Sequence, residues 1–189
     1  LKPWAVVDAI LAKKNLGTNR RMARHTVALG PGFTAGVDVD AVIETKRGHQ
    51  LGRIIWQGTA IANTGIPGLI AGYGKERVIH SQQAGFVYGL VHIGDKVKKG
   101  QPMAVLTEEP IPFGMAVTEC MGTPILASLT GFVRGLIRDG YQVPQGFKIA
   151  DIDPRDDERE NCFTISDKAR SLGGAVLTAL LWMGKGEFS

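Results

Sequence analysis

The chain has 189 residues, of which 44% are hydrophobic and 21% are charged. These shares are those of ordinary globular proteins that bury a core, so the composition excludes a disordered chain. Glycine supplies 25 residues, about twice its average share, which favours a β-rich molecule with many tight turns. The net charge of +4 is small, and no aromatic residues lie among the basic clusters, so nucleic acid is disfavoured as a partner.

Cysteine usage and hydropathy indicate the compartment. Cys120 and Cys162 do not form a CxxC pair, which favours a reducing environment over a disulfide framework. No apolar run approaches the roughly 20 residues that cross a bilayer, and no signal peptide is visible. We therefore predict a cytoplasmic protein without a membrane partner. Because the chain opens at Leu1 directly into a strand-like segment, we expect an N-terminal portion to precede it.

The first third of the chain has the pattern of an α/β sheet. Apolar segments at Trp4–Ile10 and His25–Leu29 predict two buried strands, with a short helix or turn at Leu11–Asn15 between them. The second strand runs into the glycine-rich loop Gly30–Gly36. A strand followed by such a loop is where α/β proteins bind ligands, at the carboxyl edge of the sheet.

The three glycines of this loop allow backbone N–H groups to converge on a phosphate or a carboxylate. The loop fits neither GxGxxG nor the Walker pattern, so a plain β-turn connection is the alternative. Basic residues and a tight turn containing a histidine lie in neighbouring segments. The candidate ligand-binding residues are Gly30, Gly32, Phe33, Thr34 and Gly36 of the loop, together with Lys13, Lys14, Asn15, Arg47 and His49.

The segment Asp38–Thr45 alternates as a strand does, and Leu51–Trp56 predicts the returning strand. Alternate residues of a strand share a face, so Asp38, Asp40 and Glu44 are expected side by side. Such carboxylates could hold a hard cation or act as acid and base. A solvated strand face is the alternative.

A second acidic group, Asp151 and Asp153, lies beside Arg155 near the end of the middle region. It predicts either a catalytic set or, more simply, an ion-pair loop that satisfies its own charges. The four histidines have neither HxxxH nor HExxH spacing, so the sequence predicts no metal site.

A repeat occupies the middle of the chain. The 22 residues Gly85–Leu106 recur 46 positions later as Gly131–Ile152, with nine identical positions. Average residue usage would give only about two matches. Each copy reads as strand, glycine turn, short strand, glycine turn and strand. Because so small a unit cannot bury a core alone, the two copies are expected to interlock about a pseudo-twofold axis.

That arrangement resembles the flattened barrel-sandwich of biotinyl and lipoyl carrier domains, which attach their cofactor to a lysine between the two halves. Residues 101–147 contain no lysine, and in the segment Glu119–Gly122 glycine stands where that lysine would be. We therefore predict no covalent biotin or lipoate, and we interpret the barrel as a scaffold or docking surface.

The C-terminal region predicts one helix. Ser166 is suited to its N-cap and Gly184 to its stop. Gly173–Gly174 inside the helix suggests close packing against another backbone, or a kink. The apolar positions that share one face are Ala169, Leu172, Val176, Leu180 and Met183.

The predicted fold is mixed α/β and α+β, rich in β-structure. Residues 1–80 form a partial, Rossmann-like α/β domain with the glycine-rich loop, and residues 81–155 form the barrel-sandwich. Residues 156–189 are a link followed by the helix, whose apolar face is expected to pack back on the first domain.

Long strings of the sequence resemble a known family. They are similar to strings of YqeB-type proteins: Val6–Asn15, Ala28–Gly36, Asp38–Thr45 followed by Arg47–His49, Asn63–Gly68, Ile93–Asp95, Arg134–Leu136, Asp151–Arg155 and Ile165–Lys168. These are accessory proteins of selenium-dependent molybdenum hydroxylases, and the resemblance covers essentially the whole chain. It implies that a Rossmann-like segment precedes this chain and completes any nucleotide site. Pro110–Thr123 adds residues to the hairpin between the barrel halves beyond what the resemblance implies.

Three functional hypotheses follow. The first is an accessory or maturation factor that binds an anionic ligand, with a molybdenum hydroxylase or its maturation machinery as partner. The second is a nucleotide-dependent transferase or oxidoreductase, and the third is a structural adaptor. A nucleotide or a molybdopterin-related compound is the candidate cofactor, and the sequence is compatible with a homo-oligomer.

Overall fold

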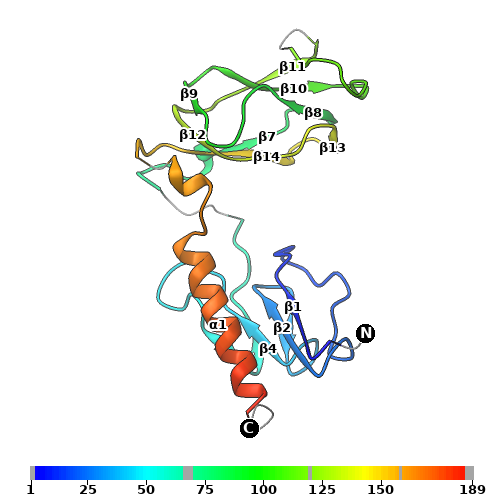
Figure 1. Ribbon diagram of the computed structural model, residues 1–189, viewed down its shortest axis with the longest axis vertical. Coiled ribbons are helices and arrows are strands. Elements are labelled where there is room, and N and C mark those ends of the chain that lie inside the picture. The colour runs from blue at the N-terminus through cyan, green and yellow to red at the C-terminus, as the bar shows by residue number, and fades with distance from the viewer. Residues whose placement is uncertain (1–2, 66–69, 119–120, 158, 186–189) are drawn as a thin grey trace. The chain divides into compact units, whose positions relative to one another are not determined.

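A computed structural model of the chain describes residues 3–65, 70–118, 121–157 and 159–185 (Figure 1). The chain divides into two compact units. Unit 1 contains Leu1–Gly65 and Ile165–Ser189, and unit 2 contains Ile66–Thr164. The sequence places the domain boundaries near residues 80 and 155. The two units instead meet after Gly65 and after Thr164. The first boundary is earlier because strand β7 (Val78–His80) pairs with a strand of unit 2.

Unit 1 is built on a mixed, mainly parallel sheet with strand order β1-β2-β4-β5. Strands β1 (Ala5–Asp8), β2 (His25–Leu29) and β4 (Ala41–Ile43) are parallel, and β5 (Ile54–Ile55) returns antiparallel to β4. Helix α1 (Asp167–Met183) runs along this sheet, as Figure 1 shows. A two-stranded ribbon joins β3 (Thr34–Ala35) to β6 (Gly58–Thr59).

Alternation along the strands divides the apolar residues of unit 1 between two cores. Val27, Leu29, Ala41 and Ile43 pack with the helix residues Leu172 and Ala179. The residues between them face the other way: Ala28 and Val42 pack with Phe33, Ala35, Val39 and Ala60. The sheet is therefore buried on both faces, as parallel strands require.

Helix α1 begins and ends where the sequence predicts. The Ser166 side chain accepts a hydrogen bond from the Ala169 N–H at 3.2 Å, and the Gly184 N–H donates to the Leu180 carbonyl at 2.9 Å. The reason proposed for Gly173 and Gly174 is wrong. Both are exposed, a Cβ at either would meet no atom within 4 Å, and the helix is continuous through them.

Two other local predictions for unit 1 are also wrong. The segment Leu11–Asn15 is neither helix nor simple turn: Leu11 and Lys13 both take positive φ, at 58° and 61°. The strand predicted from Asp38 begins only at Ala41. Side-chain hydrogen bonds explain the late start, because the carboxylate of Asp38 accepts the N–H of Thr34 and so holds the chain in a turn.

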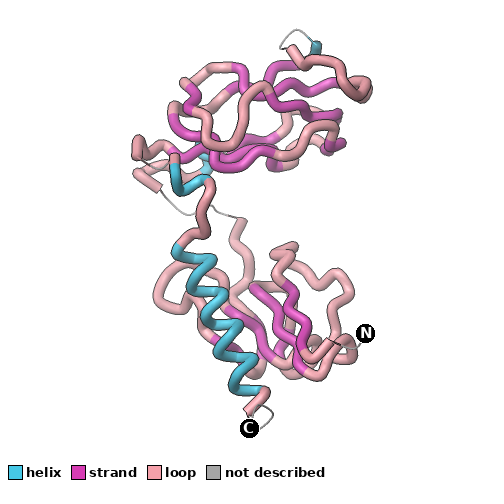
Figure 2. The backbone as a smooth tube through the Cα atoms, in the orientation of Figure 1, coloured by secondary structure: helices cyan, strands magenta, loops and turns pink. Residues whose placement is uncertain are grey.

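Unit 2 contains two four-stranded antiparallel sheets, with orders β11-β10-β8-β13 and β7-β14-β12-β9. Figure 2 traces the two sheets and the turns between them. The strands beyond β7 are β8 (Gly85–Gly89), β9 (Lys96–Val97), β10 (Pro102–Thr107), β11 (Thr123–Leu126), β12 (Gly131–Leu136), β13 (Tyr141–Val143) and β14 (Lys148–Asp153). Short 3₁₀ turns, η1 (Lys75–Arg77) and η3 (Glu160–Cys162), flank them.

The two copies of the repeat exchange their short strands. Strand β9 of the first copy pairs with β12 of the second, and β13 of the second pairs with β8 of the first. Equivalent hydrogen bonds recur 46 positions apart: the Gly94 N–H donates to the Val133 carbonyl and the Gly140 N–H to the Val87 carbonyl, both at 2.8 Å. Neither copy could complete its sheet alone, so the exchange stabilises both.

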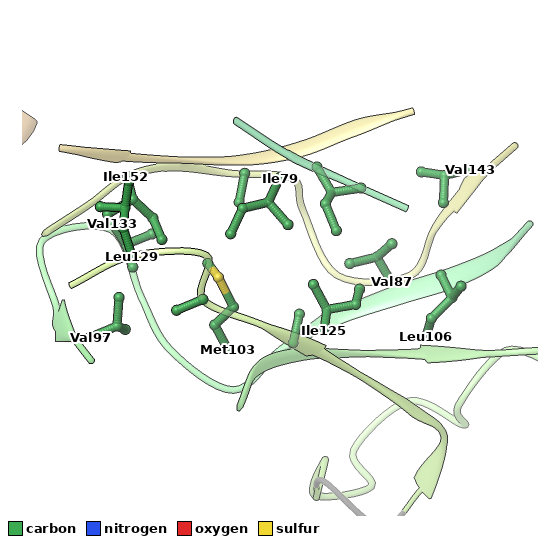
Figure 3. Packing of buried hydrophobic residues seen from close by; sticks show 14 residues of the cluster. Ile79, Val87, Val97, Met103, Leu106, Ile125, Leu129, Val133, Val143 and Ile152 are labelled. Atoms are coloured by element: carbon green, nitrogen blue, oxygen red, sulfur yellow. The ribbon is translucent and has the colours of Figure 1, made fainter. Parts of the chain in front are cut away.

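The core of unit 2 comes from both copies, as Figure 3 shows. Val87, Val97, Val133 and Val143 occupy equivalent positions and are almost completely buried, with exposed fractions of 0 to 1%. Met103 is fully buried among them. In the described residues no helix is both long enough and apolar enough for a membrane span.

Candidate functional site

The carboxyl ends of the three parallel strands in unit 1 lie next to one another. Strands β1, β2 and β4 end at Asp8, Leu29 and Ile43, and each is followed by a loop. Helix α1 begins at the same region, because the Arg47 side chain in the loop after β4 contacts its first residue, Asp167. This edge is where open parallel sheets bind their ligands.

Glycines permit close contact between these loops. A Cβ at Gly32 would lie 2.5 Å from the Lys14 Cα, so the loop after β2 lies directly against the loop after β1. A Cβ at Gly30 would lie 2.7 Å from the Thr45 Oγ1, which brings the same loop against the residues that follow β4. Only glycine fits at either position, where φ is also positive (105° and 82°).

Three cations gather at this edge. Arg47 forms a bidentate pair with Asp167, with Nη–Oδ distances of 2.8 and 3.0 Å. The Arg47 guanidinium holds the pKa of the Asp167 carboxyl well below its usual range. Lys168, the next residue of the helix, and Lys13, from the loop after β1, complete the cationic group.

Lys168 is half-buried, and burial lowers the pKa of its amine; the neighbouring charges of Arg47 and Lys13 lower it further. Glu44 opposes this shift. The Glu44 side chain is itself buried and accepts hydrogen bonds from the backbone N–H groups of Lys46 and Ile61, both at 2.8 Å. A bound anion would relieve the repulsion among the three cations.

Lys13 has a backbone conformation that is uncommon for a residue other than glycine, with φ at 61°. Such conformations cost about 1–3 kcal/mol and occur often at binding sites. Asn15 helps to hold this loop: its Nδ2 donates to the Thr18 carbonyl at 2.9 Å, and its Oδ1 accepts from the Gly17 N–H at 2.8 Å. The Asn15 side chain therefore stabilises its own loop, a structural role that differs from the ligand contact predicted for it.

The glycine-rich loop divides between two places. Gly30 and Gly32 stay at the strand ends, whereas Phe33 is buried in the core on the sheet face opposite α1. Several N–H groups of the loop are already used: Gly30 donates to the Ile43 carbonyl, Thr34 to the Asp38 carboxylate and Gly36 to the Val39 carbonyl. They are therefore not directed together at an anion, and the side-chain cations carry that capacity instead.

The first acidic group does not form a shared face. Asp38 accepts from the Thr34 N–H at 2.8 Å, while Asp40 accepts from the Thr26 N–H at 2.8 Å and pairs with Arg20 at 2.8 Å. The Glu44 carboxylate accepts from the backbone N–H groups of Lys46 and Ile61 instead. The reason is the late start of β4, which leaves Asp38 and Asp40 in a turn. The structure gives both aspartates a bracing role.

The second acidic group lies in unit 2, on strand β14. Asp153 is fully buried and accepts from Arg134 at 3.1 Å and from Arg155 at 2.7 Å. The hydrogen bond from Arg155 lowers the pKa of its carboxyl. Asp151 contacts Arg77 at 3.3 Å and Lys148 at 3.5 Å. The two aspartates are therefore engaged in ion pairs, as one of the two predicted alternatives has it, but they lie on a strand and not in a loop.

His49 is exposed in the turn after Arg47, and Lys14 is exposed beside Gly32. Cys120 lies outside the described residues. Within the described ranges, no three His, Cys, Asp or Glu side chains are placed to hold a metal ion.

Sequence reasoning missed Lys168 and Thr45 as members of this edge. Lys168 follows the predicted N-cap by two residues, so the sequence located it at a helix N-terminus, where anions are favoured. What it lacked was the position of that helix relative to the strand ends, more than 120 residues earlier in the chain. No sequence pattern marked Thr45 as a site residue, apart from its position at the end of a predicted strand.

The chain is 51% identical over 183 residues to the uncharacterised protein YqeB of Escherichia coli strain K12, which covers 97% of this chain. It is therefore homologous to YqeB, and the predicted resemblance to YqeB-type proteins is confirmed. The matched region is 31% of that relative, so the chain spans about a third of its length. No family model matches the chain.

Solved structures show only a distant likeness. An aspartoacylase family protein of Mesorhizobium loti is 19% identical, with a TM-score of 0.33, over 43% of this chain and 24% of that one. A succinylglutamate desuccinylase/aspartoacylase of Rhodobacter sphaeroides is 17% identical, with a TM-score of 0.32, over 52% of this chain and 29% of that one. A likeness at this level identifies no activity.

Proposed function

We propose that this chain binds an anionic ligand at the carboxyl edge of the β1-β2-β4 sheet, and that it does so as part of an accessory or maturation factor for a selenium-dependent molybdenum hydroxylase. The observation that carries the first part is that the loops after β1, β2 and β4 and the first turn of α1 meet at this edge, which brings together the segments that bear Lys13, Arg47 and Lys168. The resemblance to YqeB-type proteins motivates the second part.

The charges at this edge suit a phosphate or a carboxylate. Three carboxylates, Asp167, Glu44 and Asp8, lie at the same edge, and each already has partners. Asp167 pairs with Arg47, Glu44 accepts from backbone N–H groups, and Asp8 accepts from the Ile10 N–H and the Thr18 hydroxyl. The first turn of α1 adds the positive end of the helix dipole. Arg47 already makes its planar pair of hydrogen bonds with Asp167, so it acts on an anion through its charge, as Lys13 and Lys168 do.

We expect Lys168→Ala to weaken the binding of inorganic phosphate to this chain about tenfold, because it removes a half-buried charge from the site. Isothermal titration at low ionic strength measures the affinity, and added salt should weaken binding by wild type. Lys98→Ala, an exposed lysine of unit 2, is the matched control because it changes the net charge equally. Equal affinity of the two variants would remove the proposed site.

The cellular part needs a separate experiment. A host that carries Lys13→Ala and Lys168→Ala in the longer YqeB-type protein should produce normal amounts of hydroxylase polypeptide with strongly reduced activity. Immunoblots give the polypeptide amount and an activity stain gives the active fraction. If phosphate binding is lost while hydroxylase activity is unchanged, the site exists but does not serve maturation.

Strand order favours one alternative function. Parallel strands that end together at a loop-lined edge also bind nucleotides, so a nucleotide-dependent transferase or oxidoreductase is the second candidate. Its site would be completed by other parts of a longer polypeptide. Binding of ATP or NAD by a full-length YqeB-type protein, but not by this chain, would favour this alternative.

We also infer that unit 2 is a barrel-sandwich of the biotinyl and lipoyl type that has lost its carrier role. The exchange of β9 and β13 between the two copies supports the architecture. The hairpin between β10 and β11 contains no lysine, which leaves no amine for attachment. Intact-mass measurement of protein purified from its native host should therefore show no added biotin or lipoyl group. A modified mass that maps to this unit would refute the scaffold role.

A further inference from the structure

An open cavity of about 490 Å³ lies on unit 2. Its walls are residues 134–136 at the end of β12, the following Ile137, and residues 148–151 at the start of β14. The volume is within the range of small-molecule sites, roughly 300–1,000 Å³. Leu136 and Ile137 contribute apolar surface, and both are partly buried against the core.

Arg134, which lines this cavity, lies at a bulge. Val133 pairs with Ile152 and Gly135 pairs with Asp151, so Arg134 is an extra residue on β12. Strand β14 has a matching irregularity at Ile149, between the pairs that Lys148 and Ala150 make with β7. Bulges change the direction of a side chain and are common beside binding sites.

Each of the two carboxylates beside the cavity is shared by two cations. In the part of the chain that the structure describes, Asp151 contacts Arg77 and Lys148, and Asp153 contacts Arg134 and Arg155. Asp153 is fully buried and engages Arg134 and Arg155. Asp151 must therefore balance both Lys148 and Arg77, at the long distances of 3.5 and 3.3 Å.

Arg77 is the least satisfied of these groups. Its side chain is 7% exposed, and among the described residues its Nε has no hydrogen-bond partner. A buried N–H donor without an acceptor is costly, so Arg77 draws on Asp151 for its compensation. Asp151, which it contacts, is part of the cavity wall.

We propose that this cavity binds a small organic anion, with Arg134 and Lys148 at the anionic group and Leu136 and Ile137 at an apolar body. The ligand is a carboxylate or a phosphate monoester joined to an apolar group. A fully apolar ligand would leave the cations desolvated, and an inorganic ion would leave the apolar walls exposed. The site is separate from the edge of unit 1.

Gly135 offers a sharp test because it forms part of the cavity wall. Its φ is not in the left-handed region, and the only atom near a Cβ placed there is the Asp151 Cβ, at an ordinary 3.8 Å. Gly135→Leu should therefore fill the cavity without a clash at the backbone. Lys148 is 54% exposed, so Lys148→Glu reverses a charge at the rim while leaving the core unchanged.

The experiment titrates the isotope-labelled chain with phenyl phosphate, benzoate, benzyl alcohol and inorganic phosphate, and follows backbone amide shifts by NMR. Phenyl phosphate or benzoate should shift the Gly135 and Ala150 amides, with an affinity in the region of 1 mM. Whichever binds tighter identifies the anionic group. Shifts at Gly32 would report the unit 1 edge instead, so the two sites are read separately.

Gly135→Leu should abolish the shifts at Ala150, and Lys148→Glu should weaken them about tenfold. Lys99→Ala, on another turn of unit 2, should leave them unchanged. Equal binding of benzyl alcohol or of inorganic phosphate at these amides would overturn the proposal, as would unchanged affinity in Lys148→Glu. If Gly135→Leu fails to fold by thermal unfolding, Lys148→Glu decides alone.

Discussion

Replacing Asp153 by alanine should destabilise unit 2 by about 3 kcal/mol, the largest effect that we expect from a single charge in this chain. The carboxylate is completely buried and engages two arginines, Arg134 and Arg155. Without it, Arg134 and Arg155 would both lose this buried acceptor. The effect lies at the lower end for a broken buried pair because Arg155 is 41% exposed and can turn toward water.

Denaturant unfolding with the linear extrapolation measures this change. Asp153→Asn is the second variant, because it keeps a hydrogen-bond acceptor and should fall between alanine and wild type. Asp156→Ala is the matched control: Asp156 pairs with Lys96 at 2.8 Å but is 81% exposed, so its loss should hardly move the unfolding midpoint. A similar midpoint shift in Asp153→Ala and Asp156→Ala would contradict the buried-pair account.

The same carboxyl gives unit 2 a pH dependence of defined sign. Its hydrogen bond to Arg155 lowers the pKa of Asp153 in the folded state below the unfolded value of about 3.9. The folded protein thus binds this proton less readily than the unfolded chain, and the stabilisation is complete above that unfolded value. It is lost as the pH falls through the lower folded value. The stability difference between wild type and Asp153→Asn should therefore shrink below about pH 4.

Replacing Gly32 by alanine should destabilise unit 1 by about 3 kcal/mol, from two causes that add. The backbone has φ of 105°, which L-residues rarely adopt. In addition, the new Cβ would lie 2.5 to 2.8 Å from backbone atoms of Lys14, and a backbone cannot move aside as a flexible side chain can. The loop that carries Lys13 should be displaced, so phosphate binding at this edge should weaken as well.

Gly58→Ala separates the two causes. Gly58 has φ of 91°, and a Cβ there would meet nothing within 4 Å, so this variant reports backbone strain alone, about 1 kcal/mol. The difference between the two variants then measures the contact with Lys14. If both variants lose the same free energy of unfolding, the two loops are not in the close contact described, and the proposed cluster of cations loses its geometric basis.

The sequence by itself determined the interlocked β unit. Gly85 and Gly131 begin the two copies, and each lies against the carbonyl of the strand beside it, of Thr107 and of Asp153. These contacts are again 46 positions apart. The repeat was visible because a backbone that leaves no space for a Cβ demands glycine at the same place twice. Ser166 and Gly184 likewise marked the ends of α1, since capping is a local property.

Only the tertiary structure decided the candidate site. Lys13, Arg47 and Lys168 are far apart in the chain, and no local pattern relates a helix N-terminus to the ends of strands more than 100 residues away. The glycine-rich loop predicted that its backbone N–H groups would bind an anion. Gly30 and Gly36 instead donate their N–H groups to carbonyls within the fold. In the proposed site, side-chain charges from distant segments take the place of these N–H groups. Which N–H groups a sheet leaves free depends on which strands pair, and pairing is a property of the whole unit.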